Sequence, residues 1–229
     1  MRRISWLAAL LVLGAVPAMA QAPKAAAKPA AKGAEEQDVE RKIVGGGKIP
    51  AGWTVQTERD APITKVKFEQ TPSGWHVETA TIAVLYRPTD MLSRNYHLGA
   101  TFTQRDFSPG HAEPYGLILG GVVRGDTLAY TYFLVEADGK FSIRRRTGSK
   151  SVDLGSGWMD NKAIHQADAK GAATNQLLVE RTPAGVRFLI NGAEVFKASA
   201  DSAHADGFTG FRISHNLSVD VTGVMRMQM

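Results

Sequence analysis

The chain has 229 residues, a formal net charge of +5 and no cysteine. The lack of cysteine excludes disulfides, thiol nucleophiles and thiolate metal sites, so stability has to come from a buried core. The positive charge falls to +3 when Arg2 and Arg3 are discounted, which is too mild to indicate a nucleic-acid-binding protein.

The first twenty residues are typical of a secretory signal peptide. Arg2 and Arg3 precede an apolar run at residues 4–16, and Ala-Met-Ala at residues 18–20 forms a small-x-small cleavage site. The run is shorter than the roughly 20 residues that span a membrane as a helix. We therefore expect cleavage after Ala20, a mature chain without a transmembrane anchor, and a periplasmic or secreted protein.

Residues 21–48 are expected to form a flexible linker. They are rich in Ala, Lys and Pro, then turn charged, and contain no aromatic residue to bury. Removal of residues 21–45 is therefore expected to leave the melting temperature nearly unchanged. Three glycines at residues 45–47 interrupt any regular structure before the folded domain, which we place at residues 49–229.

The domain shows one short strand after another. In residues 97–104, Leu98, Ala100 and Phe102 alternate with polar positions, which is the period of a strand with one buried face. The same alternation recurs in later segments, at residues 130–135, 141–146, 175–182 and 186–190.

Turn residues separate these strands. Asp138-Gly139 and Asn191-Gly192 each predict a tight hairpin turn, because these residues tolerate positive φ. Residues 161–173 are expected to form a loop or a single helical turn, and no other stretch of a dozen residues has a helical period. The sequence therefore predicts an all-β sandwich or barrel.

The order of these motifs resembles that of a known group of domains. A Tyr-Gly strand precedes YTYFLVEADGKFSIRRRTG, residues 130–148, which a Trp, NQLLVERT, VRFLING and GFTGFRIS then follow. The series, over residues 96–226, is similar to concanavalin A-like and laminin G-like jelly rolls of bacterial exported proteins. It is most similar to domains grouped with 3-keto-disaccharide hydrolase-like proteins. The resemblance implies a two-sheet antiparallel jelly-roll sandwich, and homologues that bind or cleave glycans or mediate contacts.

The sequence contains no complete match to the catalytic and metal-binding motifs considered below. Retaining glycosidases of this fold family carry E-x-D-x-x-E on a strand, but the nearest match begins at Glu136, lacks the last Glu and falls on the predicted turn. No serine lies in a G-x-S-x-G elbow. Some laminin G-like domains bind calcium, yet no loop here has the dense Asp/Asn spacing of a calcium motif. We therefore assign no catalytic residue, metal or cofactor, although isolated acids such as Glu78, Glu113 and Glu180 can still converge in space.

Tyrosine and tryptophan side chains are the candidates for stacking on a sugar ring. Tyr130 and Tyr132 share one face of their strand, and on a concave outer face they would form a glycan platform. Trp75 is a third candidate, for which packing in the core is the competing explanation.

Arg144 and Arg146 are the candidates for polar ligand contacts. Alternation places them opposite Phe141 and Ile143, so burial of the apolar pair turns both arginines to the open face. There two guanidinium groups can grip a carboxylate or sulfate. The competing interpretation is a solvated strand face with acidic partners across the strand.

These observations favour an exported, non-catalytic β-sandwich that binds a carbohydrate or another cell-envelope polymer. One alternative is a glycoside-active hydrolase domain, and another is a structural or adhesive module that contacts a second protein.

Overall fold

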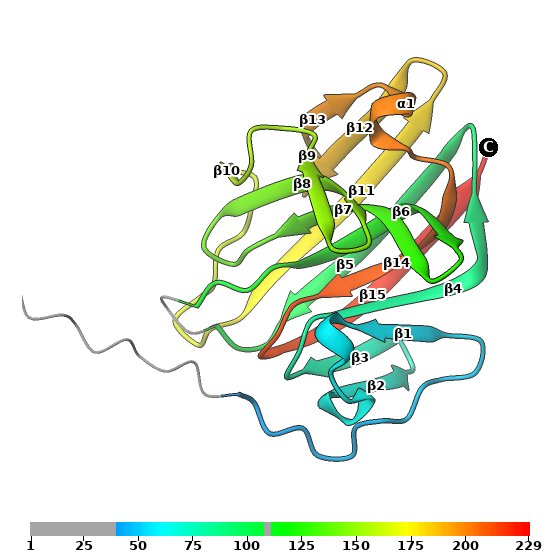
Figure 1. Cartoon of the computed structure of the whole chain (residues 1–229). Coiled ribbons are helices and arrows are strands. Elements are labelled where there is room, and N and C mark those ends of the chain that lie inside the picture. Colours follow the sequence, from blue (N-terminus) through cyan, green and yellow to red (C-terminus); the bar gives the residue numbers. More distant parts are fainter. Residues whose placement is uncertain (1–39, 108–110) are drawn as a thin grey trace, which may run out of the picture. The chain divides into compact units, whose positions relative to one another are not determined.

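The computed structural model describes residues 40–107 and 111–229, which form two stacked antiparallel sheets (Figure 1). The expected signal peptide and residues 21–39 of the expected linker lie outside the described residues. Within the described part of the chain, no helix is both long enough and apolar enough to cross a membrane. The all-β fold predicted from the sequence is confirmed.

Sheet A has eight strands. Their order is β1-β4-β14-β6-β7-β8-β10, and β9 pairs with β8 on the same edge as β10. The bounds are β1 Thr54–Thr57, β4 Ala83–Leu92, β6 Tyr115–Arg124, β7 Thr127–Val135, β8 Lys140–Thr147, β9 Lys150–Asp153, β10 Met159–Asp160 and β14 Gly207–Ile213.

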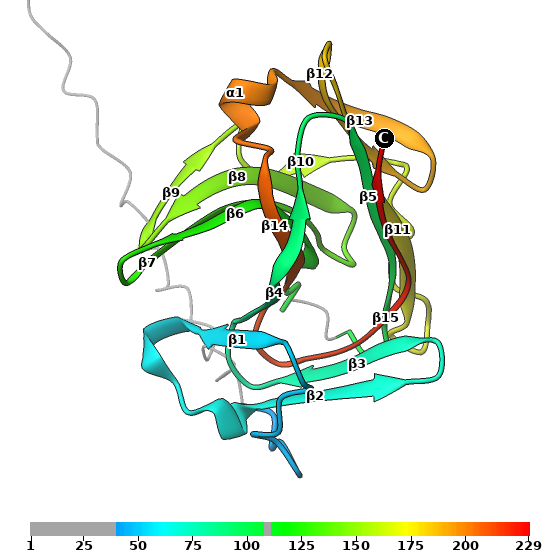
Figure 2. The same ribbon diagram turned by 90° about the vertical axis from the view of Figure 1, so that its right-hand side faces the viewer.

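Sheet B has seven strands in the order β13-β12-β11-β5-β15-β3-β2. The bounds are β2 Val66–Thr71, β3 Gly74–Thr79, β5 Tyr96–Gln104, β11 Ala173–Thr182, β12 Gly185–Ile190, β13 Ala193–Ala198 and β15 Leu217–Gln228. Figure 2 shows β6, β7 and β8 in one layer and β5, β11 and β15 in the other. Three short helical turns complete the described fold: η1 Glu58–Asp60, η2 Ile63–Lys65 and α1 Ala200–Ala203.

The core lies between the sheets and follows the predicted alternation. Leu98, Ala100 and Phe102 of β5 are buried against Phe133 of β7 and Phe188 of β12 in one continuous cluster. Each large side chain buried in this way stabilises the fold by roughly 1.5–3 kcal/mol. Burial of this cluster stabilises the sandwich in the absence of any disulfide.

The two predicted hairpin turns are present. Gly139 has φ of +104° and the Glu136 amide donates to the Lys140 carbonyl, which closes the turn between β7 and β8. Asn191 and Gly192 have φ of +50° and +82°, as a type I′ turn requires between β12 and β13. Residues 161–173 form turns and extended chain up to the first residue of β11, as the loop alternative predicted.

The end of the expected linker contacts the domain. Arg41 forms an ion pair with Asp106, and its backbone amide donates to the Asn216 side chain at 2.8 Å. The Gly47 amide donates to the Val66 carbonyl of β2 at 2.9 Å. Ordered contacts therefore begin before residue 49, where the sequence placed the start of the domain.

A second, smaller apolar cluster covers the outer face of sheet A, the face turned away from sheet B. Tyr86 of β4 and Phe208 of β14 stack there with ring centroids 4.4 Å apart. The cluster consists of Val84, Tyr86, Ile118, Leu128, Tyr130, Tyr132, Leu134 and Phe208. The outer face of sheet A therefore carries an apolar floor of its own, on which polar side chains rest.

Candidate functional site

Four of the five predicted binding residues lie together on the outer face of sheet A. The register of β7 and β8 places Tyr130 opposite Arg146 and Tyr132 opposite Arg144. Ile143, which immediately precedes Arg144 in β8, is buried in the core on the other side of the sheet. The alternation predicted for this hairpin therefore holds, and it forms two cross-strand pairs of a tyrosine and an arginine.

The two tyrosines form the floor of this face and leave little of their rings open. Tyr130 and Tyr132 are only 2% and 5% exposed, and their centroids are 6.0 Å apart. The guanidinium of Arg212, on β14, covers the Tyr132 ring at 5.2 Å. The two rings therefore support the polar side chains of this face and offer a ligand little surface of their own.

Both arginines have acidic partners. Arg144 Nε lies 2.5 Å from Asp153 Oδ1, directly across from it on β9. Arg146 Nη1 lies 2.9 Å from Glu58 Oε1, on η1. The acidic-partner interpretation therefore describes these arginines, and neither presents an uncompensated charge to a ligand.

Trp75 lies apart from the other four residues. It belongs to β3 of sheet B, and its ring packs at 5.0 Å from Trp53 and 4.9 Å from Phe68 beside the core. Trp75 therefore serves core packing and does not join the tyrosines and arginines of sheet A.

Glu58 connects distant strands across the outer face of sheet A. Its Oε1 forms an ion pair with Arg146 Nη1 at 2.9 Å and accepts a hydrogen bond from Arg212 Nη2 at 3.1 Å, so one carboxylate joins η1 to β8 and to β14. The Arg212 side chain is only 8% exposed. Burial raises the pKa of the Tyr130 hydroxyl beside this bridge, against the opposing charges of Arg212 and Arg146. That hydroxyl is therefore neutral at physiological pH and is able to donate as well as accept.

A cleft of about 540 Å³ opens beside the bridge, between η1 and the β6–β7 turn. Its lining is mixed in charge and polarity and consists of Gln56, Thr57, Glu58, Arg59, Asp60, Val84, Asp126, Thr127, Leu128, Tyr130, Arg146, Gly148 and Ser149. A cleft of this size is within the usual range for small-molecule sites. We call it the η1 cleft.

The rim of the η1 cleft holds an unusual backbone. Arg59 and Asp60 are consecutive non-glycine residues with φ of +54° and +53°. Side chains rarely adopt this region, and such conformations are concentrated at functional sites because surrounding structure has to maintain them. The strained turn carries the Arg59 and Asp60 side chains to the exposed rim, next to Glu58.

Glu58 and Arg212 are site residues that the sequence did not reveal. Glu58 is the first residue of the three-residue turn η1, and Arg212 is the one charged residue in the largely apolar GFTGFRI strand. An arginine in such a strand predicts an acidic partner elsewhere in the chain, because a buried guanidinium requires one. Nothing local to Glu58 pointed to it as that partner.

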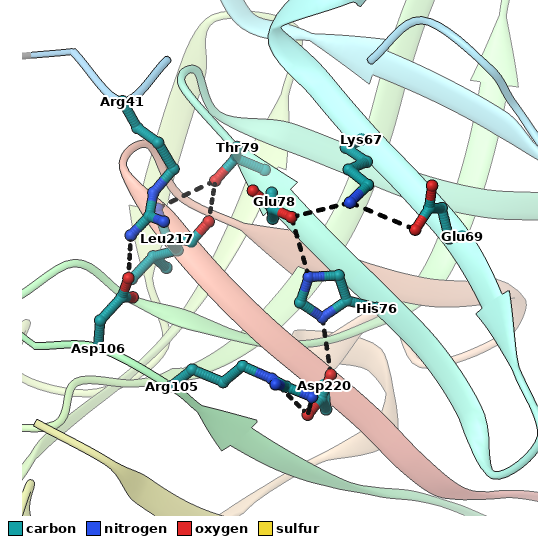
Figure 3. A network of polar contacts seen from close by, with 10 residues as sticks. All are labelled: Arg41, Lys67, Glu69, His76, Glu78, Thr79, Arg105, Asp106, Leu217 and Asp220. Carbon is teal, nitrogen blue, oxygen red and sulfur yellow. Dashed lines mark hydrogen bonds and ion pairs between the residues drawn. The ribbon is translucent and has the colours of Figure 1, made fainter. Parts of the chain in front are cut away.

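A second polar network lies on the outer face of sheet B and is satisfied internally. His76 lies between Asp220 and Glu78 (Figure 3). Its Nδ1 is 2.7 Å from Asp220 Oδ1 and its Nε2 is 3.2 Å from Glu78 Oε1. Arg105 pairs with Asp220 and Lys67 with Glu78 at 3.1 Å. Each acid in this row already has a cationic or imidazole partner, so we assign the row to the cohesion of β2, β3 and β15. Among residues 40–107 and 111–229, no set of three or more His, Asp or Glu is placed to hold a metal ion.

Comparisons with known proteins identify the fold. No protein-family model and no curated protein matches the chain. Among solved structures, the carbohydrate-binding module CBM66 from Bacillus subtilis matches with a TM-score of 0.56 and 12% identity, over 77% of this chain and 96% of that one. The metal-free Emp46p carbohydrate recognition domain matches with a TM-score of 0.50 and 12% identity, over 77% and 88%.

At these identities the likeness shows the fold alone. The fold is a concanavalin A-like jelly-roll sandwich, as the sequence predicted. Membership of the 3-keto-disaccharide hydrolase-like group stays a prediction, since no family model matches.

Proposed function

We propose that this protein is exported and binds a neutral carbohydrate at the η1 cleft, without cleaving it. The observation that carries the proposal is the lining of the cleft, in which Tyr130 lies beside an ion-paired Glu58 and Arg146. Export rests on the signal peptide predicted at residues 1–20.

The chemistry of the lining suits sugar hydroxyls. A hydroxyl donates one hydrogen bond and accepts others, and a carboxylate beside a guanidinium offers an acceptor and donors at adjacent positions. Further hydrogen-bond donors and acceptors line the cleft, in the amide group of Gln56 and the hydroxyl groups of Thr127 and Ser149. The site is therefore equipped for several hydrogen bonds to one uncharged, polar ring.

The charge balance favours a neutral ligand over the acidic one that the arginines suggested in the sequence. The cleft is lined by three acids, Glu58, Asp60 and Asp126, against two arginines, Arg59 and Arg146. Glu58 also accepts from Arg212 just outside the lining. An acidic glycan would have to displace Glu58 from both of its guanidinium partners, which would leave a carboxylate uncompensated.

The names of the structural neighbours support binding of carbohydrate in general, since one is a carbohydrate-binding module and the other a carbohydrate recognition domain. The hydrolase alternative receives less support. Glu136 and Asp138, the nearest match to the glycosidase motif, follow β7 at a hairpin turn, and Asp138 pairs with Lys140 at 2.6 Å. Asp138 therefore serves the turn, and no second catalytic carboxylate is assigned.

The test is a glycan array followed by calorimetry with the mature protein and two arginine variants. Arg146→Gln removes the positive charge that Arg146 contributes to the lining of the η1 cleft. Arg187→Gln is the matched control, since Arg187 also pairs with glutamates, Glu180 and Glu194, but on sheet B.

We expect binding of neutral glycans by the parent and the control and a clear loss with Arg146→Gln. Equal loss in both variants, or no binding by the parent, would count against the proposal. Release of products from glycosides or keto-disaccharides would favour the hydrolase alternative instead.

A further inference from the structure

An exposed tryptophan stands on the same face of sheet A, at its β10 edge. Trp158 is 37% exposed, whereas Trp53 is buried in the core. The next residue, Met159, pairs with Phe141 of β8 and packs against the core. Trp158 immediately precedes β10, and its ring lies beside the guanidinium of Arg144, which is on the outer face.

Arg144 fixes the surroundings of this ring. Its guanidinium carbon lies 5.9 Å from the Trp158 ring centroid, and its Nε pairs with Asp153. Figure 1 shows β8, β9 and β10 together at this edge. The indole is therefore held beside a cation while much of its surface remains open to solvent.

A largely buried glutamate lies within electrostatic reach of the same arginine. Glu136 follows Val135, whose side chain is in the core, and is only 9% exposed. No side chain in the described part of the chain donates a hydrogen bond to it, and Arg144 acts on it only through charge. Burial, with a smaller contribution from Asp138, raises the pKa of Glu136 to about 7. A ligand hydroxyl beside Glu136 would be able to form a hydrogen bond with its carboxyl group.

This second group of residues continues from the η1 cleft. Arg146 lines the cleft, and Arg144 is two residues away on the same face of β8. At about 3.4 Å per residue, roughly 7 Å of strand separates them. Trp158 lies beyond Arg144 along this line, so polar and aromatic side chains follow β8 from the cleft to the edge of the sheet.

We propose that Trp158, Arg144 and Glu136 form a second sugar subsite, so that the outer face of sheet A binds an oligosaccharide chain and not a single sugar. One ring of the chain occupies the η1 cleft, and a later ring stacks on the open indole face while its hydroxyls bond to Arg144 and Glu136. This inference rests on the proposed function of the cleft.

The test measures how affinity depends on chain length. Malto-, cello-, laminari- and fructo-oligosaccharides of two and six units are titrated by calorimetry and by tryptophan fluorescence. Stacking on an aromatic ring contributes about 0.5–1.5 kcal/mol, so the six-unit ligand should bind the parent about 2–12-fold more tightly than the two-unit ligand of the same series.

The variants separate the two subsites. Trp158→Ala should remove this gain and leave the two-unit affinity within about 2-fold, whereas Arg146→Gln should weaken both ligands. Val152→Ser is the control, because Val152 is exposed on neighbouring β9 but pairs with Arg145, which points to the other face. Melting temperatures confirm that each variant is folded.

Two results overturn the inference, and they differ in what they say of the cleft. If the parent binds both lengths equally and Trp158→Ala changes neither affinity, the second subsite is wrong while the cleft remains the site. If the parent binds no member of any series, the subsite and the proposed function are both wrong.

Discussion

Replacement of Glu58 by glutamine tests whether the carboxylate that joins Arg146 and Arg212 stabilises sheet A. The substitution keeps the size of the side chain and removes its charge. Arg212 then retains a nearly buried guanidinium, with its side chain 8% exposed, but loses its anionic partner. Arg146, at 21% side-chain exposure, can regain water more easily.

The expected loss follows from these exposures. A hydrogen bond to a charged group contributes about 1.5–3 kcal/mol, and a fully buried ion pair broken on one side costs about 3–5 kcal/mol. Because the Glu58 side chain is 24% exposed, we expect about 2 kcal/mol. With a urea dependence of about 2 kcal/mol per M, the unfolding midpoint should fall by about 1 M.

Glu69→Gln is the matched control for this experiment. Glu69 also pairs with a cation, Lys67 at 3.4 Å, but its side chain is 55% exposed on sheet B. Such a pair contributes about 0.2–1 kcal/mol at most. Urea unfolding followed by circular dichroism compares the two variants. If both midpoints shift equally, the bridge adds nothing beyond an ordinary surface ion pair and the reasoning fails.

Three further predictions concern pH, the linker and export. Burial raises the pKa of Glu136 from 4.5 to about 7, so the stability that its protonated form contributes is present below pH 4.5 and is lost as pH rises through 7. Glu136→Gln should therefore be more stable than the parent by about 1–3 kcal/mol at pH 8 and not at pH 4. An equal difference at both pH values would contradict this. Removal of residues 1–37 should leave the melting temperature unchanged. Removal of residues 1–45 also deletes the Arg41 contacts and should lower the melting temperature by about 2–4 °C. Equal melting temperatures of the two truncated proteins would support the expectation of a flexible linker without contacts. Mass spectrometry of the exported protein should find Gln21 at its N-terminus, and a terminus at Met1 would exclude cleavage.

Local patterns were sufficient to predict the β7–β8 hairpin and the faces of its residues. Asp138-Gly139 sets the turn, and alternation from Phe141 then sets the side on which each arginine lies. Trp75 could have been assigned to the core by the same rule, because it shares a strand face with Val77, which is buried. Its large aromatic ring suggested stacking, but strand parity was the better guide.

The η1 cleft could not be predicted from the sequence, because segments that are far apart in the chain form it. Glu58 meets Arg146 only after β1 has paired with β4 at one edge of sheet A and β8 has paired with β7 near the other. Arg59 and Asp60 both have a left-handed backbone, which no local sequence pattern predicts for an arginine. The same long-range contact gave the arginines their acidic partners and so changed the expected ligand from acidic to neutral.

The position of the last two strands has a consequence for how the chain reaches its native state. β14 is inserted between β4 and β6, and β15 between β3 and β5, so the final segment of the described chain completes both sheets from within. Neither sheet can close during synthesis until the C-terminal residues have emerged, and pairings between such distant segments form slowly. A chain that cannot close early stays unfolded for longer, and loss of β14 and β15 would split each sheet into two separate parts instead of leaving a smaller domain.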